Sequence, residues 1–142
     1  MNENQKDTVL IVDDTRSICI LVNAALKNTF NTQIANDGEE ALKIAFSDNP
    51  PDLILLDVMM PKMDGYEVCA RLKADQRTKH IPVIFVTAKT QFADIKKGFE
   101  VGGIDYIMKP INLPDLMTRV TARLNLENAM KANQDLRNKL NK

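Results

Sequence analysis

The sequence contains few of the residues that form covalent cross-links or bind transition metals. Its 142 residues include two cysteines, one histidine and no tryptophan. Cys19 and Cys69 each stand alone inside a helical pattern, without the Cys-x-x-Cys spacing of a metal or redox site. We interpret both as buried thiols in a reducing compartment, rather than as a disulfide or a pair of metal ligands.

An excess of charge of one sign and long hydrophobic runs are also absent. The 19 basic and 19 acidic side chains cancel, so the composition gives no electrostatic reason to expect nucleic-acid or membrane binding. No apolar run approaches the length of a membrane span, and residues 1–6 lack the apolar core of a signal peptide. We therefore expect a cytoplasmic protein with a single hydrophobic core.

Five apolar segments predict five buried strands. Thr8–Val12 and Leu53–Leu56 are continuously apolar near their ends, which is typical of strands covered on both faces of a parallel sheet. The other predicted strands are Thr32–Ala35, Pro82–Val86 and Ile104–Met108. Helical spacing separates them, over Arg16 to about Phe30, Glu39–Phe46, Tyr66–Ala74, Phe92–Phe99 and from Leu113 almost to the last residue. This alternation predicts an α/β fold with a doubly wound parallel sheet. We expect the strand order 2-1-3-4-5, because it is the common order of five-stranded, flavodoxin-like sheets of this kind.

Polar residues follow four of the predicted strands. Asp13 and Asp14 come after the first strand, Asp57 after the third, Thr87 after the fourth and Lys109 after the fifth. The predicted order makes strands 1 and 3 neighbours, so the three carboxylates should lie side by side at one edge. Close carboxylates stay ionised only beside a cation, and ligand sets made only of oxygen favour Mg²⁺. The sequence therefore predicts a magnesium site.

This group of side chains suits a phosphoryl group. Mg²⁺ and Lys109 would neutralise its oxygens and Thr87 would donate a hydrogen bond, while Asp57 is the natural nucleophile for an aspartyl phosphate. Each residue alone has a simpler explanation, because an Asp pair can cap a helix, Thr87 can belong to a turn and Lys109 can be solvated. The functional interpretation depends on all of them reaching one edge.

Four segments resemble the receiver domain of bacterial two-component response regulators. They are Val12–Asp14, Leu56–Gly65, Val86–Ala88 and Tyr106–Pro110, and the resemblance covers about residues 7–125. It implies a signalling switch in a phosphorelay, which catalyses only its own phosphorylation and dephosphorylation and is not otherwise an enzyme. The phosphoryl group would come from a histidine kinase or a phosphotransfer protein.

The resemblance implies roles for the acidic residues. Asp57 would be the phosphoacceptor. Asp14 and Asp57 would bind Mg²⁺ directly, together with the backbone carbonyl of Met59. Asp13 would act on the metal mainly through water.

The resemblance also implies how the switch responds. Thr87 and Lys109 would contact the phosphoryl group and relay its presence. Tyr106 would be the switch aromatic residue, which turns inward as the hydroxyl of Thr87 moves toward the phosphate. The Lys109–Pro110 peptide bond would be cis.

The last predicted helix continues past the domain. We expect residues 1–7 to be disordered, 8–124 to form the receiver domain, and 125–142 to be a helical linker or coiled coil toward an output domain missing from this sequence. Apolar positions there step by four and three, with Asn133 at an a position, which favours a parallel homodimer. The positions are Ala122, Leu126, Ala129, Asn133, Leu136 and Leu140. A single exposed helix is the alternative, because the repeat covers less than about three heptads.

The resemblance suggests that the output domain is related to cyclic-di-GMP synthesis or hydrolysis, or is a histidine kinase module. No helix-turn-helix for DNA follows in the given chain. A Mg²⁺-dependent phosphatase or phosphotransferase with an Asp nucleophile would place an Asp-x-Asp motif after the first strand, where Asp13-Asp14-Thr15 stands. A flavodoxin-like cofactor carrier would need a phosphate loop there, and Asp13-Asp14 would repel its phosphate. We expect neither.

Overall fold

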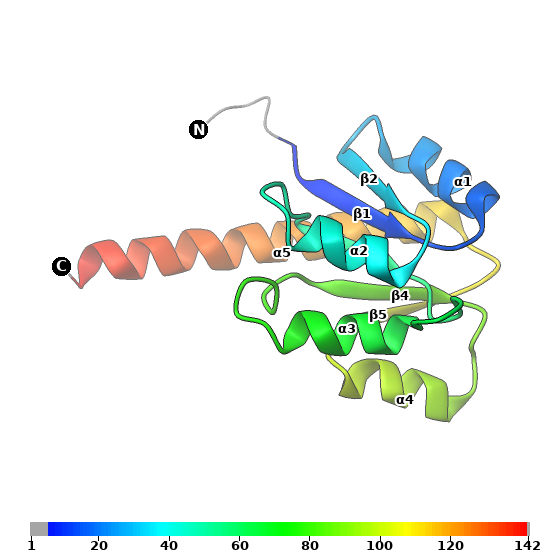
Figure 1. The fold of residues 1–142 in the computed structure, drawn as a ribbon. Helices are drawn as coiled ribbons and strands as arrows, with labels where there is room; N and C mark the ends of the chain where they lie inside the picture. Colours follow the sequence, from blue (N-terminus) through cyan, green and yellow to red (C-terminus); the bar gives the residue numbers. More distant parts are fainter. Residues whose placement is uncertain (1–5, 142) are drawn as a thin grey trace.

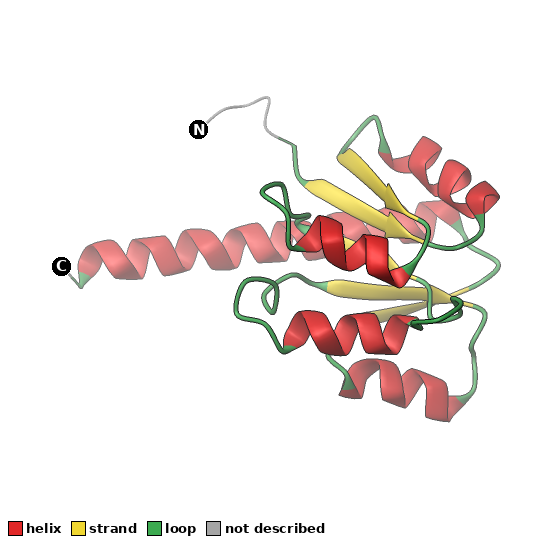
Figure 2. Ribbon diagram, viewed as in Figure 1, coloured by secondary structure: helices red, strands yellow, loops and turns green. Residues whose placement is uncertain are grey.

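The computed structural model describes residues 6–141 and has a parallel five-stranded sheet with helices on both faces (Figures 1 and 2). The strands are β1 (Thr8–Val12), β2 (Asn31–Ala35), β3 (Leu53–Leu56), β4 (Val83–Thr87) and β5 (Asp105–Met108). The helices are α1 (Arg16–Leu26), α2 (Gly38–Ala45), α3 (Gly65–Lys73), α4 (Phe92–Glu100) and α5 (Leu113–Leu140). The strand order β2-β1-β3-β4-β5 confirms the predicted topology.

Both faces of the central strands are buried, which explains their continuous apolar sequences. Successive side chains of a strand point to opposite faces. Leu10 and Ile54 pack with residues of α2 and α3 in one core cluster. Val9 and Leu53 pack with residues of α1 and α5 in the other. The single core expected from the sequence is therefore divided by the sheet into two clusters, one on each face.

Helix α1 is shorter than the sequence pattern predicted. The prediction extended it to about Phe30, whereas the helix ends at Leu26. The backbone amides of Thr29 and Phe30 both donate to the carbonyl of Leu26, so the chain turns there toward β2. Phe30 is only 6% exposed, because it packs into the core from this turn rather than from the helix. The apolar spacing alone could not distinguish these two placements.

Helix α5 extends past the domain, as the sequence predicted. Its first part is packed on the sheet through Leu116, Val120 and Leu124. Beyond them the helix projects from the end of the sheet where the strands begin (Figure 1). The amide of Asn128 donates to Asp7 Oδ2 at 3.1 Å, next to the start of β1. Of the segment predicted to be disordered, residues 1–5 lie outside the described residues.

Two other expectations concern the thiols and the membrane. Cys19 and Cys69 are both free and buried, which confirms their interpretation as core thiols. Among residues 6–141, no helix combines the length and the apolar character needed to cross a membrane.

Candidate functional site

The ends of β1 and β3 bring the three predicted carboxylates together. The backbone amide of Asp57 donates to Val12 of the neighbouring strand at 3.0 Å, which places Asp57 beside the end of β1. One carboxylate oxygen from each of Asp13, Asp14 and Asp57 lies within 4.8 Å of the others. Asp13 is 3% and Asp57 4% exposed, whereas Asp14 is exposed to solvent. The predicted convergence of these residues therefore exists in the fold.

Lys109 bridges the two buried carboxylates. Its Nζ lies 2.8 Å from Asp13 Oδ2 and 3.1 Å from Asp57 Oδ2. Burial alone would lower the pKa of Lys109, but the hydrogen bonds to Asp13 and Asp57 outweigh this effect and raise the pKa above its ordinary value. The ammonium group therefore stays charged at neutral pH. The Lys109–Pro110 peptide bond is cis, as the resemblance implied.

The charge of the site is not balanced by Lys109 alone. Burial raises the pKa of Asp57, the hydrogen bond from Lys109 lowers it in part, and the neighbouring charge of Asp13 raises it further. The backbone amide of Met59 donates to Asp57 Oδ1 at 3.2 Å. Three clustered carboxylates and one ammonium leave an excess of negative charge. An oxygen-rich site with this charge fits a hard divalent cation such as Mg²⁺.

Helix capping does not explain Asp13. The N-cap residue of α1 is Thr15, and its side chain makes no capping hydrogen bond. Asp13 Oδ1 accepts a hydrogen bond from the backbone amide of Thr15 at 2.8 Å, before the first helical residue. Its other oxygen binds Lys109. The carboxylate of Asp13 thus belongs to the acidic cluster rather than to the first turn of α1.

A tight loop between β3 and α3 packs directly on Asp57. The backbone amide of Gly65 donates to Val58 at 2.9 Å, which closes the loop. A Cβ atom on Gly65 would lie 2.3 Å from the carbonyl oxygen of Asp57. Asp64 caps α3 through the backbone amide of Glu67 at 2.9 Å, as expected for an Asp at this position. The closeness of Gly65 therefore helps to fix the position of Asp57.

Thr87 and Tyr106 both form hydrogen bonds with the loop between β4 and α4. Thr87 is the last residue of β4 and is fully buried, and its hydroxyl accepts from the backbone amide of Lys89 at 3.3 Å. Tyr106 is 8% exposed, and its hydroxyl donates to the carbonyl of Lys89 at 2.7 Å. No hydrogen bond joins Thr87 to the acidic cluster within residues 6–141. The two residues share a backbone partner in Lys89.

Tyr66 was missed by sequence reasoning, which placed it only at the start of a helix. Its hydroxyl lies 3.4 Å from that of Tyr106 and donates to the carbonyl of Asp94 at 2.8 Å. The available signal was its position: an aromatic residue in the first turn of the helix that follows the Asp57 loop.

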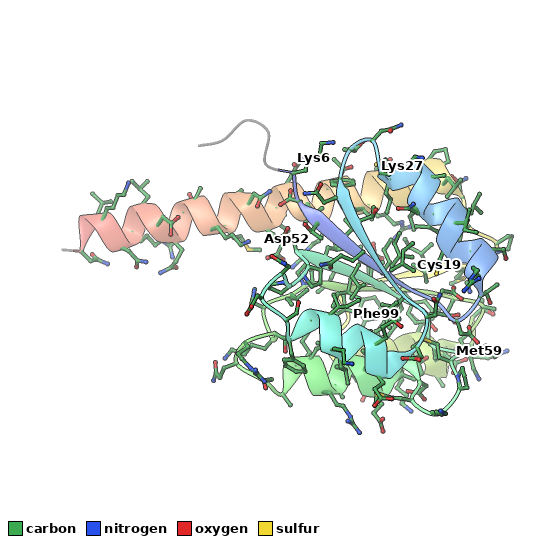
Figure 3. The ribbon with its side chains drawn as sticks, turned by 45° about the horizontal axis from the view of Figure 1, so that its top comes forward. Lys6, Cys19, Lys27, Asp52, Met59 and Phe99 are labelled. Atoms are coloured by element: carbon green, nitrogen blue, oxygen red, sulfur yellow. The ribbon has the colours of Figure 1, made fainter. Side chains whose placement is uncertain are left out.

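Met59, the predicted source of a backbone carbonyl ligand, lies at the edge of the sheet where the strands end (Figure 3), and it is 52% exposed.

Comparisons with known proteins identify the family. The family model of the response regulator receiver domain matches residues 9–121. A protein of Vibrio cholerae named a probable cyclic di-GMP phosphodiesterase is 40% identical over 87% of this chain, which covers 28% of that protein. The histidine kinase P4 of Formosa agariphila is 37% identical over 92% of the chain, covering 9% of its length. The DNA-binding response regulator MtrA of Mycobacterium tuberculosis is 40% identical over 86% of the chain, covering 52% of its length.

Solved structures agree with this match. The crystal structure of a response regulator from Chloroflexus aurantiacus has a TM-score of 0.80 and 34% identity, with 85% of this chain and 99% of that chain covered. The chain belongs to the response regulator receiver domain family, whose members act as phosphorylation-dependent switches in two-component signalling. It spans about half or less of the curated relatives described above. The comparisons do not favour the alternative function, a Mg²⁺-dependent phosphatase or phosphotransferase with an Asp nucleophile.

Proposed function

We propose that Asp57 is the phosphoacceptor of this receiver domain. The observation that carries the proposal is the ammonium of Lys109, which lies within 3.1 Å of both Asp13 and Asp57 beside the exposed Asp14. In this role Mg²⁺ would be held by Asp14, Asp57 and the backbone carbonyl of Met59, with Asp13 acting mainly through water. The bound Mg²⁺ would supply positive charge for the phosphoryl oxygens.

The donor would be the phosphohistidine of a histidine kinase or of a phosphotransfer protein. A carboxylate oxygen of Asp57 attacks the phosphorus, and a new P–O bond forms as the P–N bond of the donor breaks. The bonding electron pair stays on the imidazole nitrogen of the donor. Lys109 is placed to turn from the carboxylate of Asp57 to the phosphoryl oxygens, because its ammonium already lies 3.1 Å from Asp57 Oδ2.

Thr87 and Tyr106 would then relay the phosphorylated state. The Thr87 hydroxyl now accepts a hydrogen bond from the backbone amide of Lys89 at 3.3 Å. Movement of this hydroxyl toward the phosphoryl group would break that bond. Because Tyr106 donates to the carbonyl of the same residue, a shift of the loop would reach Tyr106 directly. The domain would catalyse only its own phosphorylation and dephosphorylation, in the cytoplasm.

Intact-mass spectrometry after incubation with acetyl phosphate tests the proposal. We expect one phosphoryl adduct on the wild-type chain in Mg²⁺, and none in EDTA or on the Asp57→Asn variant. Asp52→Asn is a matched control, because Asp52 precedes β3 at the opposite end of the sheet from Met59 (Figure 3). An adduct that survives in Asp57→Asn would contradict the assignment.

We also propose that the projecting part of α5 forms a parallel homodimer and leads to an output domain of a longer protein. Leu126, Leu136 and Leu140 are 48%, 56% and 75% exposed, so the predicted seam has no partner within the described chain. A phosphodiesterase and a kinase among the relatives support an output domain related to cyclic di-GMP or a kinase module. We propose that the receiver domain itself contacts neither a membrane nor nucleic acid.

Sedimentation velocity over a range of concentrations tests the dimer. We expect the wild-type chain to dimerise, and Leu136→Glu to weaken association at least about tenfold by placing a charge in the seam. Gln134→Glu adds the same charge outside the seam and should leave association unchanged. A wild-type chain that stays monomeric at every concentration would refute the dimer.

A further inference from the structure

Two tyrosines and a phenylalanine form an aromatic row beneath α4. The ring centres of Tyr66 and Phe85 are 5.5 Å apart, and those of Phe85 and Tyr106 are 5.9 Å apart. Phe85 is fully buried, while Tyr66 is 5% and Tyr106 8% exposed. The row joins α3, β4 and β5, and it brings the two hydroxyl groups to 3.4 Å from each other.

Both hydroxyl groups donate to the backbone at the start of α4. Tyr66 donates to the carbonyl of Asp94 in the first turn of the helix, and Tyr106 donates to the carbonyl of Lys89 in the loop before it. The helix has few other attachments, since Gly98 is its single buried residue and the N-cap Gln91 makes no side-chain hydrogen bond. The two tyrosines therefore hold a weakly packed element.

The donors and acceptors of the Tyr66 and Tyr106 hydroxyls determine which hydrogen bonds these two groups can form. Each hydroxyl has one proton to donate and two lone pairs that accept. Both protons already go to carbonyls at 2.8 and 2.7 Å, so neither is available for the contact between the two oxygens. If the Lys89 carbonyl moves, the proton of Tyr106 has a second buried acceptor in the Tyr66 oxygen. Tyr106 can then stay inside without an unsatisfied donor.

We propose that Tyr66 is a positioning residue of the switch: its hydroxyl anchors the first turn of α4 and keeps Tyr106 in the buried position. The ammonium of Lys97, also on α4, lies 4.8 Å from the centre of the Tyr66 ring and ties the same two elements together. The inference rests on the proposed function, because the position of Tyr106 carries a signal only if Asp57 is phosphorylated.

The chain has two tyrosines and no tryptophan, which makes the test direct. Labelling with 3-fluorotyrosine gives two ¹⁹F signals, and Tyr66→Phe leaves only that of Tyr106 while keeping the ring that packs on Phe85. We expect the Tyr106 signal of Tyr66→Phe to gain a larger solvent isotope shift in D₂O. In Mg²⁺, the concentration of beryllofluoride, a phosphoryl mimic, at half-saturation should rise roughly two- to tenfold, as expected for the loss of one buried hydrogen bond.

Thr78→Val is a matched control for the loss of a buried hydroxyl. Thr78 is fully buried, and its hydroxyl donates to the carbonyl of Leu72 at 2.7 Å near the other end of α3. This variant should lose stability but leave the Tyr106 signal and the beryllofluoride titration unchanged. In a Tyr106→Phe background, Tyr66→Phe should change the titration much less than in the wild type, because the two hydroxyls act together.

The inference is overturned if Tyr66→Phe leaves both the Tyr106 signal and the titration at their wild-type values, or if Thr78→Val changes them equally. A wild-type chain that does not respond to beryllofluoride would instead contradict the proposed function. The solvent isotope shift would still test the role of Tyr66, because that measurement needs no phosphoryl mimic.

Discussion

Replacing Gly65 by alanine should damage both the stability of the domain and the geometry of Asp57. The new Cβ would lie 2.3 Å from the carbonyl oxygen of Asp57 and 2.9 Å from Val58 Cα. A carbon and an oxygen normally approach to about 3.3 Å, so one of them must move by about 1 Å. Because the obstructing atoms are backbone, no side-chain rotation relieves the contact.

The size of both effects follows from this displacement. Overpacking of this kind costs about 1–3 kcal/mol, and the higher helix propensity of alanine at the first residue of α3 offsets less than about 1 kcal/mol. We expect the free energy of unfolding to fall by about 1–2 kcal/mol. A displacement of about 1 Å at a reacting group can slow a reaction by about a hundredfold, so formation of the acetyl-phosphate adduct should slow at least tenfold.

Urea denaturation and timed intact-mass measurements provide the assay. Gly38→Ala is the matched control, because Gly38 is also the buried first residue of a helix capped by an aspartate, here Asp37. Its Cβ would lie 2.8 Å from a Val68 methyl group, which can move, and 3.2 Å from the Cβ and the carbonyl oxygen of Met63, contacts that a shift of a few tenths of an ångström relieves. Gly38→Ala should therefore phosphorylate at the wild-type rate. If Gly65→Ala keeps the stability and the rate of the wild type, the close approach to Asp57 does not position the phosphoacceptor.

Three further changes test the electrostatics. Lys109→Met should lower the free energy of unfolding by about 3 kcal/mol in urea, because Asp13 and Asp57 stay buried without their shared cation. Without Mg²⁺, Asp57→Asn should instead raise the free energy of unfolding by on the order of 1 kcal/mol, because burial and the charge of Asp13 disfavour the charged carboxylate of Asp57. A lower free energy of unfolding in this variant would contradict that explanation. Burial raises the pKa of the Cys69 thiol from 9.0 to about 11. The stability that the neutral buried thiol gives the folded state is therefore fully present below pH 9, and it is lost as the pH rises through 11. Between pH 9 and pH 11, the free energy of unfolding of the wild-type chain should fall by about 2–3 kcal/mol more than that of Cys69→Ala. Parallel pH profiles of the two proteins would refute this prediction.

The sheet and the convergence of Asp13, Asp14 and Asp57 could be predicted because they depend on chain order. Runs such as Leu53–Leu56 identify strands buried on both faces, and the residues that follow them must lie at one edge of a parallel sheet. The extension of the last helix was predictable for a different reason, because its apolar spacing continues past the domain.

Details that depend on side-chain direction and tertiary contacts were not predictable. The sequence gives no reason why Asp13 is buried and Asp14 exposed, or why Lys109 binds both Asp13 and Asp57. Phe30 continues the helical spacing of α1, but it packs into the core from the turn after that helix. The position of this turn depends on how the chain joins β2, which the spacing does not show. The position of Tyr66 in the first turn of α3 is visible in the sequence, but its link to Tyr106 appears only when the fold brings the two hydroxyls to 3.4 Å from each other.

The central claim is that the phosphoryl group is attached to Asp57, and borohydride reduction tests it most directly. Borohydride converts an aspartyl phosphate to homoserine, and peptide sequencing by mass spectrometry then identifies the modified residue. After incubation with acetyl phosphate and Mg²⁺, we predict homoserine at position 57 and aspartate at positions 13 and 14. Homoserine at either of those positions, or no homoserine on a chain that carries a phosphoryl adduct, would contradict the account.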